Sequence, residues 1–277
     1  MSNLRSILVH LDGTVRAEVR LRLAHRLAAN HQASLTALFA VVPRYLPLFP
    51  LAGGMPSIPL PSDIDPDHRA HAMALFERTR DAGAPQCDWR ELTGESVTEE
   101  FALQALTADL VVLGQRDPTD ATGFDVPADF VESVVIDSGR PALVIPYVGE
   151  VTATPQTVLL AWKPTRESAH ALSAALPFLQ AAKRVHLVSA YESEADTQPV
   201  PPQPAEYLRL HGIERVHEHR WLDDSDAGDG LLSLAADTGA DLIVMGCYGH
   251  SRARELVLGG ATRTMLQSMT VPVLMAH

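Results

Sequence analysis

The sequence predicts an α/β protein made of two similar halves, each a doubly wound parallel sheet. An internal repeat is the first observation: Asp109-Leu-Val-Val-Leu-Gly114 nearly duplicates Asp241-Leu-Ile-Val-Met-Gly246, and Ile7–Thr14 parallels Val158–Thr165 in the same order. The second is that short apolar runs without polar interruption alternate with amphipathic stretches. Uninterrupted apolar runs are typical of strands buried on both faces. Strands alternating with helices over short connections predict a parallel sheet with helices on both sides.

The first copy spans residues 1–147 and contains five expected strands and four expected helices. Each strand is a short apolar run, and each helix has apolar residues at a spacing of three to four. The expected strands are Ile7–Leu11, Leu35–Val41, Cys87–Leu92, Leu110–Leu113 and Ala142–Ile145. The expected helices are Val15–Ala29, Asp67–Ala82, Val97–Leu106 and Asp129–Asp137.

A proline-rich insertion interrupts the first copy at Pro43–Pro66. Its seven prolines exclude a regular helix or an inner strand. We interpret it as a loop packed over the first copy, and the alternative is a partner-binding flap that exposes Leu46, Leu48 and Phe49.

The second copy spans 156–277 after a linker at 148–155, and it repeats the same order of elements. Its expected strands are Val158–Trp162, Val185–Ala190, Val216–Trp221, Leu242–Met245 and a closing strand after Thr270. Its expected helices are Glu167–Ala182, Ala205–Leu210, Gly230–Asp237 and Ala261–Ser268.

Bulk composition excludes several classes of protein. The 277 residues contain no apolar run of the roughly 18 residues that a membrane helix needs. The N-terminus lacks a signal-peptide pattern, and the two cysteines are far apart, so we expect a cytoplasmic protein. The net charge of −12 argues against nucleic acid as a partner, because phosphate neutralisation requires clusters of Lys and Arg.

The most informative stretch is a glycine-rich turn near the end of the chain. The strand Leu242–Met245 runs into Gly246-Cys-Tyr-Gly249, and Gly259 and Gly260 precede the helix Ala261–Ser268. A strand, a glycine turn and a helix N-terminus together present backbone N–H groups to an anion. Gly246-x2-Gly249-x9-Gly259 resembles the nucleotide-binding signature of the universal stress protein family. The matching repeat extends the resemblance over the chain as a tandem member of that family.

The resemblance implies a specific architecture. Each copy would be a Rossmann-like, adenine nucleotide alpha hydrolase-like domain with strand order 3-2-1-4-5. Its ligand would bind in the crevice between the first and fourth strands, where the strand order reverses. Single-domain family members pair through the fifth strand, so the two copies are expected to form an intramolecular pseudo-dimer. Further homodimerisation stays open.

The resemblance also implies ATP, with or without Mg²⁺, as the ligand of the second copy. Gly246, Gly249, Gly259, Gly260, Ala261 and Thr262 would surround the phosphates and the ribose. The adenine side would be formed by Ala161, Trp162, Lys163 and Ala190, and the remaining site residues would be Met245 and His250. Two positions depart from the family pattern, since Gly260 stands where Ser or Thr is usual and Lys163 where Asp is usual. Lys163 cannot accept a hydrogen bond from the adenine amino group.

The first copy has the complementary pattern. It keeps the aspartate at Asp12, but the second and third glycines after Gly114 are missing. Four carboxylates stand there against the single cation Arg116, and they disfavour a triphosphate. They are Asp117, Asp120, Asp125 and Asp129. We therefore predict that the first site is lost.

The leading hypothesis is a stress-response protein whose C-terminal domain binds ATP and whose surface is read by an unknown protein partner. The alternative is a nucleotide-independent scaffold that imitates a family dimer. The loop contains no identifiable general base or magnesium carboxylate, so we expect at most weak ATP hydrolysis and assign no catalytic residue. We expect no metal site, although His217-x-His219 places two imidazoles on one face of a strand.

Overall fold

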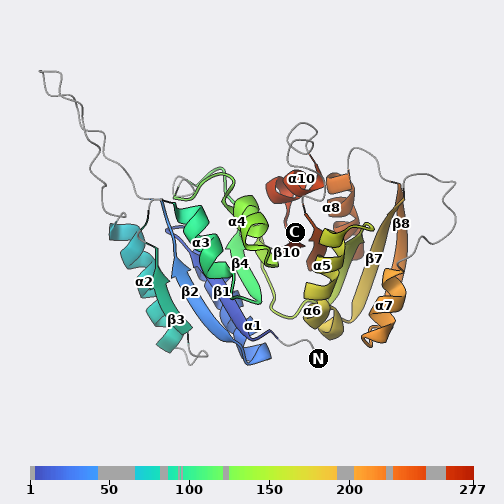
Figure 1. Ribbon diagram of the computed structural model, residues 1–277, viewed down its shortest axis with the longest axis horizontal. Helices are drawn as coiled ribbons and strands as arrows, with labels where there is room; N and C mark the ends of the chain where they lie inside the picture. The colour runs from blue at the N-terminus through green and yellow to red at the C-terminus, as the bar shows by residue number, and fades with distance from the viewer. Residues whose placement is uncertain are drawn as a thin grey trace, which may run out of the picture.

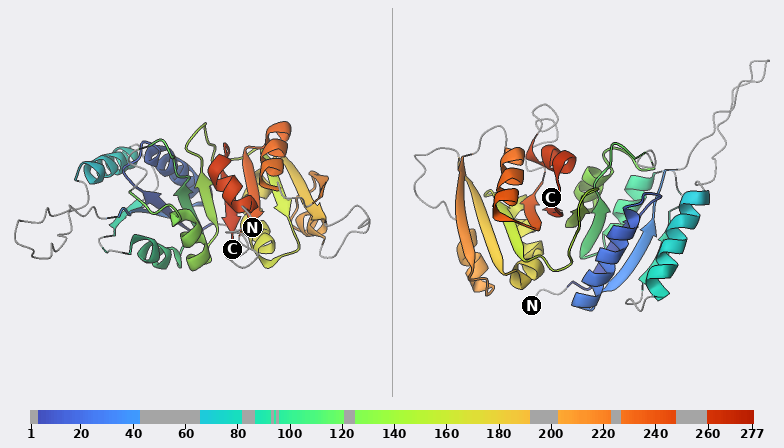
Figure 2. Two further views of the ribbon diagram at one scale, coloured as in Figure 1. Left: turned by 90° about the horizontal axis from the view of Figure 1, so that it is seen from above. Right: turned by 180° about the vertical axis from the view of Figure 1, so that it is seen from behind.

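The computed structural model describes residues 4–42, 66–81, 87–92, 94, 96–120, 125–191, 203–222, 227–247 and 260–277. All ten strands in this part of the chain belong to one sheet of order β3-β2-β1-β4-β5-β10-β9-β6-β7-β8. Helices cover both faces of the sheet in each half (Figures 1 and 2). The predicted insertion Pro43–Pro66 lies outside the described residues except for Pro66, where a helix begins.

The N-terminal half has the predicted strand order 3-2-1-4-5, and its strands pair in parallel. Uninterrupted burial along β1, β4 and β5 confirms that these apolar runs are inner strands. The strands are β1 Ser6–Leu11, β2 Ser34–Phe39, β3 Cys87–Glu91, β4 Leu110–Gly114 and β5 Ala142–Ile145. The helices are α1 Ala17–His31, α2 Pro66–Asp81, α3 Val97–Ala105 and α4 Phe130–Ser138.

The C-terminal half repeats this order, with β6, β7, β8, β9 and β10 in the places of β1 to β5. The strands are β6 Thr157–Trp162, β7 Arg184–Tyr191, β8 Val216–Leu222, β9 Leu242–Gly246 and β10 Val273–Ala276. The helices are α5 Arg166–Ala174, α6 Leu176–Ala181, α7 Pro204–Leu210, α8 Ala227–Thr238 and α10 Ala261–Ser268.

The prediction of one helix over Glu167–Ala182 is wrong. The structure has two helices, α5 and α6, that meet at Ala175. Pro177 lies at the start of α6, where its missing N–H costs nothing, whereas inside a continuous helix it would remove a hydrogen bond and clash with the preceding turn.

The two halves join through their fifth strands. Strand β10 pairs antiparallel with β5, with Leu274 opposite Leu143, so the predicted intramolecular pseudo-dimer is confirmed. Side chains add to this contact: the Gln115 amide donates to the Leu266 carbonyl of α10 at 2.9 Å. The apolar core forms one cluster on the side of α1, α2, α5, α6 and α7 and another on the side of α3, α4, α8 and α10.

Each half also fixes the start of its first strand with a carboxylate. Asp109 accepts hydrogen bonds from the backbone N–H groups of Arg5 and Ser6, and Asp241 accepts them from Gln156 and Thr157. The repeat of these aspartates in the sequence therefore reflects a structural role, the anchoring of β1 to β4 and of β6 to β9.

Candidate functional site

The crevice where ligands bind in doubly wound sheets is present in both halves, between β1 and β4 and between β6 and β9. The strand registers make the two crevices comparable position by position. Ile7 pairs with Leu110 in one half, and Val158 pairs with Leu242 in the other. His10 is therefore equivalent to Ala161, Asp12 to Lys163 and Gly114 to Gly246.

In the N-terminal crevice, the charge of Asp12 is neutralised by the protein itself. Its carboxylate lies 2.6 Å from the Arg20 guanidinium and accepts hydrogen bonds from the backbone N–H and the hydroxyl of Thr14. Burial alone raises the pKa of Asp12, but the charges of Arg20 and His10 and these hydrogen bonds outweigh it and lower the pKa to about 2. Asp12 is thus a buried, fully paired carboxylate, without the free acceptor that the sequence pattern suggests.

His10 fills the same crevice with an aromatic ring. Its Nε2 donates to the carbonyl of Ala40 at 2.8 Å, and its ring centre lies 4.7 Å from that of Phe130. Burial lowers the pKa of His10 to about 4, although the neighbouring Asp12 acts in the opposite sense. His10 is therefore a neutral core residue at pH 7.

We expect His10 to make the protein less stable as the pH falls from about 6.5 to about 4. In the unfolded chain, His10 binds a proton near the ordinary imidazole pKa of about 6.5, whereas in the folded chain it binds the proton only near pH 4. The unfolded state binds more protons within this window, so stability decreases as the pH drops, by roughly 3 kcal/mol in total. Urea unfolding of wild type and His10→Gln across this range measures the difference. Equal pH slopes for the two proteins would contradict it.

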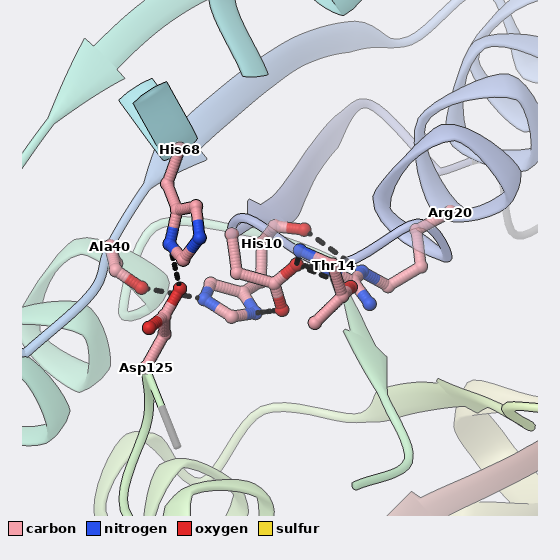
Figure 3. A network of polar contacts seen from close by, with 7 residues as sticks. His10, Thr14, Arg20, Ala40, His68 and Asp125 are labelled. Carbon is pink, nitrogen blue, oxygen red and sulfur yellow. Dashed lines mark hydrogen bonds and ion pairs between the residues drawn. The ribbon is translucent and has the colours of Figure 1, made fainter. Parts of the chain in front are cut away.

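The outer part of the N-terminal crevice is closed by His68 of α2 and by Asp125. Their Nδ1 and Oδ2 atoms lie 2.6 Å apart, and Asp125 is buried (Figure 3). Phe130, the first residue of α4, closes the crevice from the other side. The described residues leave a cavity of about 40 Å³ here, whereas sites for small organic ligands enclose roughly 300–1,000 Å³. The cavity is far too small for a nucleotide.

The C-terminal half has alanine at each of the three positions that carry these large side chains. Ala161 of β6 is equivalent to His10 by register. Ala261, the first residue of α10, is equivalent to Phe130, the first residue of α4. The buried pattern along α1 and α5 aligns Arg20 with Ala171, since Ala17, Arg20 and Leu21 match Ser168, Ala171 and Leu172. The second crevice therefore lacks the side chains that fill the first.

The N-terminus of α10 has the properties of an anion-binding helix end. Gly260 is its N-cap, no side chain among the described residues caps its amide groups, and its first turn contains no acidic residue. The equivalent helix α4 begins after Asp129 and has Glu132 in its first turn. Backbone N–H groups that are left without a side-chain cap, together with the helix dipole, favour negative charge at α10.

Gly246 allows β9 and α5 to approach each other closely at this crevice. A Cβ atom on Gly246 would lie 2.5 Å from the backbone nitrogen of Ser168 and 2.7 Å from the carbonyl carbon of Glu167. Real Cβ contacts are not this short, so glycine is required here for packing as well as for any approach of a ligand.

The structure brings together part of the predicted nucleotide site. Ala161 and Lys163 lie at the end of β6, Met245 and Gly246 at the end of β9, and Gly260, Ala261 and Thr262 at the start of α10. The indole of Trp162 is buried in the core cluster on the α5 side. Ala190 lies near the end of β7. Gly249, His250 and Gly259 lie outside the described residues.

The sequence analysis missed His10, Arg20 and Phe130, the residues that close the N-terminal crevice. It predicted the loss of that site from the charges of Asp117, Asp120, Asp125 and Asp129. The structure adds that Asp125 is paired with His68 and that Asp117 caps a turn at Thr119. An alignment of the two copies could have identified these three residues, because it places each of them opposite an alanine.

Comparison with known proteins agrees with this fold. Residues 155–277 match the model of the Universal stress protein family. Universal stress protein Slr1230 from Synechocystis is 27% identical over 173 residues, which cover 60% of this chain and 57% of that protein. The chain thus spans less than two thirds of the length of this curated relative.

Two solved structures resemble the whole chain. A universal stress protein from Archaeoglobus fulgidus aligns with a TM-score of 0.71 at 17% identity, covering 98% of this chain and 96% of that one. A putative universal stress protein from Pseudomonas aeruginosa aligns with a TM-score of 0.60 at 18% identity, covering 99% of this chain and 93% of that one.

The fold and the crevice define an α/β protein of two Rossmann-like domains. The C-terminal half matches the universal stress protein family, and the layout of the whole chain fits a tandem form of that fold. In the part of the chain that the structure describes, none of the helices is both long and apolar enough to cross a bilayer.

Proposed function

We propose that this chain binds one adenine nucleotide, ATP, in its C-terminal half and acts as a cytoplasmic regulatory module. The observation that carries the proposal is the contrast between the two crevices. His10, Arg20 and Phe130 fill one of them, and alanines stand at the equivalent positions in the other. This contrast supports one ligand site per chain, in the C-terminal half.

The proposed ligand extends from the end of β6 to the N-terminus of α10. The adenine would lie against Ala161, Lys163 and the end of β7 at Ala190. The backbone N–H groups of Gly260, Ala261 and Thr262 would donate to the phosphates, as would the glycine turn that begins at Gly246. Lys163 would donate to a ring nitrogen or to a phosphate oxygen, since an ammonium group has no acceptor.

The regulatory part of the proposal follows from where the phosphates would lie. They would bring negative charge to the surface between Gly246 and Gly260. A protein partner would then read the changed surface. Bound ATP supplies a triphosphate and a purine, and no residue of this chain is assigned to its hydrolysis.

Calorimetric titration of ATP, ADP and GTP tests the proposal after copurified nucleotide has been removed and identified by mass spectrometry. We expect one site per chain and tighter binding of adenine than of guanine nucleotides. Two sites per chain would contradict the assignment of a filled N-terminal crevice. The absence of both binding heat and thermal stabilisation at millimolar ATP would refute nucleotide binding itself.

Lys163 favours a second candidate function, a nucleotide-independent scaffold. The residue that stands opposite Asp12 in the repeat is a cation, so the carboxylate that recognises adenine in this family is missing from the open crevice. On this alternative, the ten-stranded pseudo-dimer itself is the functional unit, and partner binding does not respond to ATP.

A further inference from the structure

We propose that the C-terminal half binds a second ligand, a small multiply phosphorylated anion, at the opposite end of its sheet from the glycine turn. The site is a cavity of about 650 Å³ at the amino ends of β6, β7 and β8. In Figure 1 this is the lower edge of the C-terminal half, beside α6 and α7. The cavity is lined by Gln156, Thr157, Lys183, Arg184, Glu214, Arg215, Val216 and His217.

The charge of this cavity is opposite to that of the whole chain. Lys183, Arg184 and Arg215 supply three cations and Glu214 one carboxylate, in a protein of net charge −12. Among the described residues, none of the three cations forms an ion pair with a carboxylate. A local excess of unpaired positive charge in a hollow attracts an anion with several charges.

The backbone that carries these side chains is held in place. The carbonyl of Gln156 accepts hydrogen bonds from the N–H groups of Lys183 and Arg184, and the carbonyl of Arg215 accepts one from Val185. The nearby carboxylate of Asp241 already accepts hydrogen bonds from Gln156 and Thr157. Asp241 is therefore engaged in anchoring β6, and the cationic side chains project from a fixed frame.

Two of the three cations, Lys183 and Arg184, have neutral counterparts in the N-terminal half, so the fold does not require them. By register Ser34 is equivalent to Arg184, because Ser34 pairs with Ser6 and Arg184 with Thr157. Ala33 is likewise equivalent to Lys183. The same turn is thus neutral in one copy and doubly positive in the other.

The residue types indicate phosphoryl groups. An arginine fork binds two oxygens of one phosphoryl group, and a lysine adds a point charge. A volume of about 650 Å³ lies in the range of small-molecule sites, roughly 300–1,000 Å³. Arg184 also donates to the Thr157 hydroxyl at 3.1 Å, which orients its guanidinium along the wall of the cavity.

Titration of tripolyphosphate into the full chain at about 0.05 M salt, where charges are weakly screened, tests this site. The variant Lys183→Gln/Arg215→Gln removes two exposed cations and should weaken binding roughly tenfold or more. Arg209→Gln is the matched control, since Arg209 is an exposed cation of α7 outside the cavity that lies 4.0 Å from Glu218. It should change the affinity by less than about twofold.

Two outcomes would overturn the proposal. One is the absence of any binding of tripolyphosphate to wild-type protein. The other is binding that Lys183→Gln/Arg215→Gln leaves unchanged, which would assign the anion to another surface such as the glycine turn. Titration of ATP into the same variant distinguishes this anion site from the proposed ATP site, because we expect the double substitution to leave the ATP affinity as in wild type.

Discussion

The double substitution Ala161→His/Ala261→Phe is expected to abolish ATP binding. It places in the open crevice two of the three large side chains that fill the N-terminal one, where His10 and Phe130 have ring centres 4.7 Å apart. The imidazole would take the space of the adenine, and the phenyl ring would block the approach of the phosphates to the start of α10. We therefore expect at least about a hundredfold loss of affinity, equivalent to roughly 2.7 kcal/mol. Calorimetry with ATP measures it.

The control for this experiment is Ala236→Phe, at an exposed position of α8. It adds an aromatic ring to the same half without entering the crevice, and ATP affinity should stay as in wild type. Thermal unfolding of each variant shows whether the fold is retained. Near-wild-type ATP binding by a folded Ala161→His/Ala261→Phe protein would show that the nucleotide does not lie against these alanines.

The second large effect is expected from Arg20→Leu. Arg20 and Asp12 are both buried and lie 2.6 Å apart, and a Cβ atom on Gly114 would lie 2.4 Å from the Arg20 guanidinium. Removing Arg20 leaves the Asp12 carboxylate buried with its main charge partner gone, which costs about 3–5 kcal/mol of unfolding free energy. Urea unfolding measures the loss.

Two further variants distinguish the loss of the Arg20–Asp12 ion pair from a general loss of packing. Arg20→Leu/Asp12→Leu removes both charges and should recover part of the stability, because no uncompensated carboxylate remains. Arg22→Leu breaks an exposed pair with Glu18 on the same helix and should cost no more than about 0.5 kcal/mol. If Arg20→Leu were as mild as Arg22→Leu, Asp12 would not depend on Arg20 for its charge.

Much of the fold could be predicted because it follows from local patterns that occur twice. The uninterrupted apolar run Leu110–Leu113 and its copy Leu242–Met245 predicted inner strands, and both runs are buried. The junction of the halves followed from the family resemblance and is confirmed by the antiparallel pairing of β5 and β10. Helix boundaries were less predictable, since the spacing of apolar residues continues across the break at Ala175 between α5 and α6.

The candidate sites were only partly predictable. The glycine turn was visible because glycine at fixed spacing is a local signal, and the start of α10 at Ala261 agrees with it. The closing of the N-terminal crevice was predicted from a local cluster of carboxylates. The side chains that fill it come from β1, α1 and α4, and the anion cavity combines three separate turns.

The sequence by itself determined the strands, most of the helices and their repetition, because burial on one or both faces imposes a period on the residues along each element. Only the tertiary structure showed that His10, Arg20 and Phe130 together fill the N-terminal crevice. His10, Arg20 and Phe130 are separated by up to 120 positions in the chain, and Asp125 meets His68 only through folding. Whether a side chain fills a crevice depends on distances between separate elements of the fold, and the periodicity along one strand does not predict those distances.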